Sequence, residues 1–211
     1  MRRFPFVLLC VLTLVLIAGV AGAGASTPRH SARHVKASKS RFVSNKAAKA
    51  YAARVTYLVS IDSSYDQVCA SMLDIIGQWV VGEREHQGDG TNAFGVIEQE
   101  AAAQYASWDS DAGLKHTYGQ YLKQFDKMDG SCAKYFRRAA DRRKLKRLAG
   151  YASADFSKLD DVQLDIGAAF HDLSIGSFDS AQTDANDALT VRFKYSLVVV
   201  TDLQALKALE H

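Results

Sequence analysis

Apolar side chains recur at alternating steps of four and three residues from position 51 onward. This spacing places them on one face of an α-helix, so we predict a long helix from about residue 44 to residue 82. Ser63 and Ser64 follow the one polar member of the row and are residue types that begin helices. A break at Asp62 is therefore the alternative to one continuous helix. The row consists of Tyr51, Val55, Leu58, Asp62, Tyr65, Cys69, Met72, Ile76 and Trp79.

Three further apolar rows predict three further helical segments. The second row covers residues 91–125 and is interrupted at residues 109–113, which predicts a kink or a turn. The third row covers residues 145–173, and the fourth covers residues 177–203. Residues 191–197 alternate with period two, which favours a strand. Because no partner strand is apparent, we predict that this segment is helical as well.

The four rows together predict the fold class. From residue 29 onward the chain contains no proline, and alanine is abundant. Long amphipathic helices joined by short polar turns pack together as a bundle. We therefore predict one all-α domain over residues 44–211, an antiparallel up-down helical bundle of about four long helices.

The first 25 residues have the pattern of a secretory signal peptide. Arg2 and Arg3 give a positive start, an apolar run follows at residues 6–20, and small residues stand at 21–25. We expect residues 1–25 to be removed and the protein to be secreted or extracytoplasmic, in the periplasm or cell envelope. An uncleaved signal anchor is the alternative, because the segment is long enough to span a bilayer of about 30 Å.

Residues 26–43 have a composition of their own. The segment contains no acidic residue and few large apolar side chains, so it cannot bury enough surface to offset the entropy of ordering. We predict a flexible basic arm, which either approaches an anionic surface or serves as a spacer between the signal and the fold. Its basic residues are Arg29, His30, Arg33, His34, Lys36, Lys39 and Arg41.

The net charge argues against nucleic acid as a partner. The whole chain carries 26 Lys and Arg against 23 Asp and Glu, a net charge of +3. Signal removal takes away Arg2 and Arg3 but no acidic residue, which leaves the mature chain at +1. Nucleic-acid-binding domains carry a strong excess of basic side chains, so we expect no nucleic-acid partner.

Two cysteines, Cys69 and Cys132, remain after signal removal. In an exported chain such a pair predicts one disulfide bond, and two buried thiols are the alternative. The bond needs Cα atoms within about 7 Å of each other, whereas an unbroken first helix in a plain bundle separates them by more than about 30 Å. Three alternatives follow: the first helix breaks near Asp62, the interruption at residues 109–113 is a real turn, or there is no bond. Of these we favour the broken helix.

Basic side chains cluster at residues 134–147, where eight cations accompany a single acid, Asp141. Acidic side chains dominate residues 155–187, with eight aspartates against Lys158. We predict that the basic cluster binds an anionic partner, which is a protein or an envelope polymer or lipid surface. A solvated helix face and pairing with acids of neighbouring helices are the alternatives. The predicted binding residues are Lys134, Arg137, Arg138, Arg142, Arg143, Lys144, Lys146 and Arg147.

The chain lacks the short motifs of common enzymes, among them Gly-x-Ser-x-Gly, a glycine-rich phosphate loop and Cys-x-x-Cys. Glu83 and His86 form one Glu-x-x-His motif, whereas a di-iron bundle needs two. Asp62 and Asp155 occupy apolar rows, where each is a helix cap, half of a buried ion pair or a ligand-binding acid. We predict a non-catalytic binding module with no catalytic residue, no cofactor and no metal. A metal- or cofactor-binding bundle that uses Glu83, His86 and Asp62 is the alternative.

Overall fold

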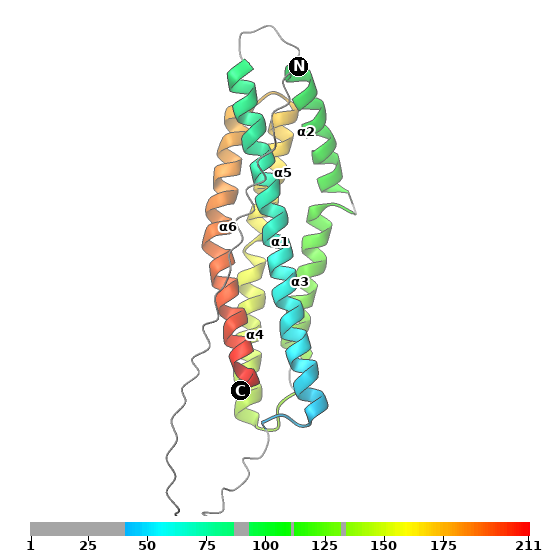
Figure 1. The fold of residues 1–211 in the computed structure, drawn as a ribbon, viewed down its shortest axis with the longest axis vertical. Coiled ribbons are helices and arrows are strands. Elements are labelled where there is room, and N and C mark those ends of the chain that lie inside the picture. The colour runs from blue at the N-terminus through cyan, green and yellow to red at the C-terminus, as the bar shows by residue number, and fades with distance from the viewer. Residues whose placement is uncertain (1–40, 87–92, 111, 132–133) are drawn as a thin grey trace, which may run out of the picture. The chain divides into compact units, whose positions relative to one another are not determined.

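The computed structural model describes residues 41–86, 93–110, 112–131 and 134–211. No β-strand occurs among these residues, although an isolated backbone bridge joins Phe42 to Phe136. The predicted all-α fold class is confirmed. The helices are α1 (Asn45–His86), α2 (Ala93–Asp109), α3 (Leu114–Ser131), α4 (Ala139–Ser157), α5 (Asp160–Ser174), α6 (Phe178–Lys207) and the short 3₁₀ helix η2 (Ala208–Glu210) (Figure 1).

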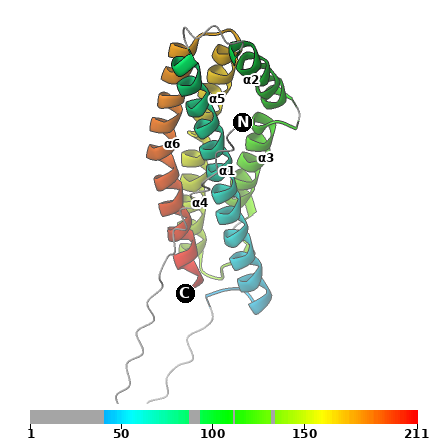
Figure 2. The ribbon, with the colours of Figure 1, turned by 45° about the horizontal axis from the view of Figure 1, so that its top comes forward.

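The helices form four long rods. α1 and α6 are one rod each, whereas α2 leads into α3 and α4 leads into α5 (Figure 1). Successive rods run in opposite directions, as the two views show (Figures 1 and 2). The prediction of about four long antiparallel helices is thus confirmed for the described residues. All four rods contribute to one apolar core, whose members include Val55, Ile76, Phe125, Ile166 and Leu203.

α1 is one continuous helix of 42 residues, so the predicted break at Asp62 is wrong. Ser63 and Ser64 lie exposed on its surface. The buried stripe continues without a change of phase on both sides of Asp62, from Tyr51 to Val80. Burial of a continuous stripe stabilises a single helix by more than a cap stabilises a new helix end.

The predicted interruption at residues 109–113 is a turn between α2 and α3. The backbone N–H of Gly113 donates to the carbonyl of Ser110 at 2.9 Å and so closes the turn. A Cβ atom on Gly113 would lie 2.1 Å from the carbonyl oxygen of Ser107. The turn therefore requires a residue without a side chain at this position.

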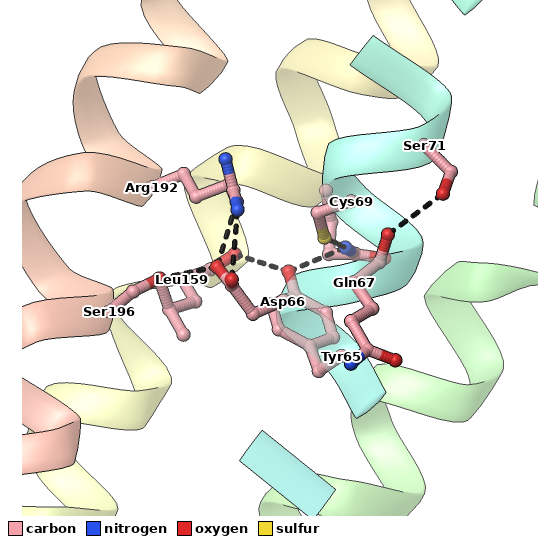
Figure 3. Close-up of polar contacts among 9 residues, drawn as sticks. Tyr65, Asp66, Gln67, Cys69, Ser71, Leu159, Arg192 and Ser196 are labelled. Atoms are coloured by element: carbon pink, nitrogen blue, oxygen red, sulfur yellow. Dashed lines mark hydrogen bonds and ion pairs between the residues drawn. The ribbon is translucent and has the colours of Figure 1, made fainter. Parts of the chain in front are cut away.

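The third predicted helix is divided into α4 and α5 at Lys158 and Leu159, a break that the apolar spacing does not indicate. Two buried tyrosines from other rods donate hydrogen bonds to backbone carbonyls at this break. Tyr118 Oη donates to the carbonyl of Ser157 at 2.9 Å. Tyr65 Oη donates to the carbonyl of Leu159 at 3.1 Å (Figure 3). Two aspartates in the first turn favour the restart of the helix as α5.

Residues 191–197 belong to α6, so the prediction of helix over strand is confirmed. The period-two pattern has a simple origin in the packing of α6. Val191 and Tyr195 pack against the core, whereas Phe193 and Leu197 point to solvent. The alternation thus mixes core residues with apolar residues on the outer surface.

The N-terminal predictions fall mostly outside the described residues. These include the signal segment 1–25, with its alternative as an anchor, and residues 26–40 of the predicted arm. The last three residues of that arm belong to the bundle: Phe42 is buried and stacks on Phe136 with ring centres 4.7 Å apart. The helices that are described include none with the length and apolar character needed to cross a membrane.

Candidate functional site

The eight basic residues predicted to bind an anionic partner, here called the basic surface, lie at the start of α4 and just before it. All eight are exposed. The α4 helix turns Leu145 and Ala149 toward the core, so Arg143 and Arg147 point away from it. The structure therefore brings the predicted residues together on one solvent-facing surface.

Two contacts with residues 41–43 fix the position of this surface on the bundle. Arg137 donates to the carbonyls of Phe42 at 2.7 Å and of Val43 at 2.9 Å, so its guanidinium ties the start of the chain's fold to the segment before α4. Asp141, the acid of the cluster, pairs at 2.8 Å with Arg41. The acid is thereby engaged by a cation from outside the cluster.

The other seven cations of the basic surface form no ion pair with any described residue. Within the described part of the chain, no carboxylate lies within ion-pair distance of them. The predicted alternative of pairing with acids on neighbouring helices therefore finds no support in the described residues. These cations are Lys134, Arg138, Arg142, Arg143, Lys144, Lys146 and Arg147.

A shallow hollow of about 440 Å³ lies within the basic surface, lined by Arg143, Lys146, Arg147, Gly150 and Tyr151. The Tyr151 side chain is 53% exposed. A Cβ atom on Gly150 would touch nothing within 4 Å, so packing does not require glycine there. Glycine in a helix costs about 1 kcal/mol relative to alanine, and its effect here is to open a space between three cations and an aromatic ring. The sequence pattern marked the cations but not Gly150 or Tyr151.

The acids of α5 and α6 gather around one another and not around the basic surface. Burial raises the pKa of Asp165, and the charges of Asp184, Asp187 and Asp161 add to the effect. Burial likewise raises the pKa of Asp184, which also lies near Asp172 and Asp187. The opposite charges predicted from the sequence thus form separate surfaces, on the start of α4 and along α5 and α6.

Asp62 is buried, with 5% of its surface exposed, at the edge of a second hollow between α1 and α6. Burial raises the pKa of Asp62 to about 7, and the nearby carboxylate of Asp66 contributes. Asp66 itself accepts two hydrogen bonds at 2.8 Å from Arg192 and one at 3.0 Å from Ser196 (Figure 3). The structure thus places Asp62 beside a charge pair that the sequence pattern did not indicate.

Asp155, the second acid in an apolar row, is a local partner. It pairs with Lys158, three residues later on the α4–α5 break. Burial and then a hydrogen bond with Asp155 raise the pKa of Asp202 to about 6. Asp155 therefore belongs to a carboxyl pair beside Lys158, and because the Lys158 side chain is exposed this is a local ion pair and not a buried one.

The residues of the alternative metal site do not all lie close together. Asp62 and Glu83 stand 21 positions apart on the continuous α1, which corresponds to about 31 Å, so Asp62 shares no site with Glu83 and His86 in one chain. The side chains of Glu83 and His86 lie outside the described residues. No group of three or more His, Cys, Asp or Glu that could hold a metal ion occurs among the side chains that are described.

The predicted disulfide stays a prediction because Cys132 lies outside the described residues. Cys69 is a buried thiol with 0% of its surface exposed. It stands about 36 Å along α1 from the start of the helix at Asn45. Burial raises the pKa of the Cys69 thiol to about 11, so the thiolate form is disfavoured.

Comparisons of the chain with protein-family models, with curated proteins and with solved structures gave no match. The fold and the site define the class: a helical bundle with an exposed basic surface at and before the start of α4. The cations of this surface form no ion pair with a described carboxylate, and the acid Asp141 is held by Arg41.

Proposed function

We propose that this protein is an exported, non-catalytic helical bundle that binds an anionic partner through the basic surface of α4. The partner is a protein or an anionic envelope component such as a polymer or lipid surface. One observation supports the proposal most: three cations and an exposed tyrosine surround a hollow, and no carboxylate among the described residues pairs with those cations.

Electrostatics gives the physical reason. Unpaired cations close together on one helix repel one another. Arg142 and Arg143 also lie near the N-terminal end of α4, where the helix dipole is positive. An anionic partner that binds at this surface relieves both effects at once, and the exposed ring of Tyr151 provides apolar contact beside the charges.

The test is a charge reversal that spares the structural contacts. Arg137 is left unchanged because it bonds to Phe42 and Val43. We expect the double variant Arg143→Glu and Arg147→Glu to lower binding of the full chain to phosphatidylglycerol vesicles and to polyglutamate by about tenfold or more at low salt. Co-sedimentation measures the first and fluorescence anisotropy the second.

The matched control reverses two exposed lysines elsewhere, Lys49→Glu and Lys123→Glu, and makes the same change in net charge. We expect this variant to keep most of the binding. A third variant, Tyr151→Ala, leaves the charge unchanged and is expected to weaken binding several-fold. Equal binding by the wild-type chain and the Arg143→Glu, Arg147→Glu variant would contradict the proposal.

A further inference from the structure

The hollow between α1 and α6 has the size of a small-molecule site. Its volume is about 460 Å³, within the range of roughly 300–1,000 Å³ that is typical of ligand pockets. α1 contributes Val59, Asp62, Ser63 and Asp66, and α6 contributes the other lining residues. Those are Arg192, Phe193, Ser196, Leu197 and Val200.

Three charged residues line this hollow, and two of them pair with each other. Arg192 binds Asp66 through two nitrogens, so these two charges neutralise each other. Asp62 has neither a hydrogen bond nor an ion pair with any described residue, although only 5% of its surface is exposed. A buried carboxylate without a partner is costly, and Asp62 is the uncompensated charge of the hollow.

The rim of the hollow is apolar and open. Phe193 is 81% exposed and Leu197 is 66% exposed, and both lie on the outer side of α6. Val59 and Val200 are also exposed and line the same hollow from the two helices. Large apolar side chains with this exposure offer contact area to a bound molecule.

We propose that the α1–α6 hollow binds a small organic ammonium ion with an aromatic or aliphatic body. The ammonium group pairs with the Asp62 carboxylate, and the body packs against Val59, Phe193 and Leu197. A cation at this position supplies the counter-charge that no described residue supplies to Asp62.

Other ligand classes fit the hollow less well. An anion is repelled by Asp62, since Arg192 already holds Asp66. A neutral apolar molecule leaves the Asp62 charge without a partner and removes the remaining water from it. A bare divalent metal ion needs several oxygen ligands, and the second carboxylate of the hollow is bonded to Arg192 and Ser196.

The experiment compares three probes of similar shape on the full chain: phenethylammonium, 2-phenylethanol and 3-phenylpropanoate. We expect isothermal titration calorimetry at pH 8 to show saturable binding of phenethylammonium at least about tenfold tighter than that of the other two. Because Asp62 has a pKa of about 7, binding at pH 7 is expected to release a fraction of a proton. Titrations in buffers with different ionisation enthalpies measure that proton.

Two variants locate the site. Asp62→Asn keeps the shape of the side chain and is expected to weaken phenethylammonium binding about tenfold or more and to abolish the proton release. Phe193→Ala is expected to weaken binding several-fold, whereas Leu164→Ala, which truncates an exposed apolar side chain of α5, is expected to leave it unchanged. Thermal unfolding of each variant shows whether the fold is intact. Absence of saturable phenethylammonium binding, equal binding of the three probes, or unchanged binding by Asp62→Asn would overturn the proposal.

Discussion

Asp62 places a carboxyl group in an otherwise apolar row, and no described residue hydrogen-bonds to it. Its pKa rises from 3.8 to about 7, first because of burial and then because of the charge of Asp66. Between about pH 4 and pH 7 the folded protein therefore keeps a proton on Asp62 that the unfolded chain has already released. The stability that this proton contributes is complete in acid and is lost as the pH rises toward 7.

The variant Asp62→Asn isolates this effect. Near pH 3, below the ordinary pKa of 3.8, Asp62 is mostly protonated in both states, so we expect the free energy of unfolding to be close to that of the wild-type chain. At pH 8 we expect the variant to be more stable by roughly 1–3 kcal/mol, because it has no buried charge. Urea unfolding at the two pH values measures the difference.

The control for this prediction is Asp74→Asn, the same change on an exposed position of α1. It is expected to change the free energy of unfolding by less than about 0.5 kcal/mol at either pH. A variant Asp62→Asn that is less stable than the wild-type chain at pH 8 would show that the Asp62 carboxylate stabilises the fold.

The junction of α4 and α5 depends on the hydroxyl groups of two buried tyrosines. Tyr65 Oη donates to the carbonyl of Leu159 and also accepts a hydrogen bond from Gln163 at 2.6 Å. Tyr118 Oη donates to the carbonyl of Ser157. Removal of such a hydroxyl removes a buried hydrogen bond, which costs about 0.5–1.5 kcal/mol and more where a buried polar group loses its partner.

We expect Tyr118→Phe to lower the free energy of unfolding by about 1–2 kcal/mol, and Tyr65→Phe to lower it by more, since Gln163 also loses its partner. Tyr57→Phe removes a hydroxyl from an exposed ring and is expected to change stability by less than about 0.5 kcal/mol. Denaturant midpoints of the three variants provide the comparison. Equal stabilities of Tyr65→Phe and Tyr57→Phe would rule out the assigned role.

The apolar spacing predicts the helical elements well where the buried stripe alone decides the backbone. It predicts the α2–α3 turn and the helical state of residues 191–197, and both are confirmed. It does not predict the α4–α5 junction, because the hydroxyl groups that bond to the backbone carbonyls there belong to Tyr65 and Tyr118, which lie on other rods. The expected break at Asp62 is wrong because the buried stripe continues in phase through Asp62, so a single helix buries all of it.

The basic surface and the α1–α6 hollow differ in how far the sequence indicates them. The exposed cations of the basic surface lie within 14 consecutive positions, 134–147, so the charge pattern alone indicates them. The α1–α6 hollow joins Asp66 to Arg192, which are 126 positions apart, and only the packing of the two rods reveals it. A site made of distant residues leaves no local pattern, whereas a charged segment of one helix does.

Charge is also segregated along the described bundle, with the basic surface at the start of α4 and the aspartates on α5 and α6. Asp184 lies near Asp172 and Asp187, and burial and these charges raise its pKa. Because Asp184 is largely solvated, water screens most of this repulsion.

We expect Asp184→Asn to raise the free energy of unfolding at pH 7 by a few tenths of a kcal/mol at low salt, a gain that shrinks as salt is added. Asp109→Asn, which removes an ion pair of 3.1 Å with Lys115, is expected to have the opposite sign. Thermal unfolding at low and high salt measures both variants, and a gain for Asp184→Asn that grows with salt would mean that like-charge repulsion is not its cause.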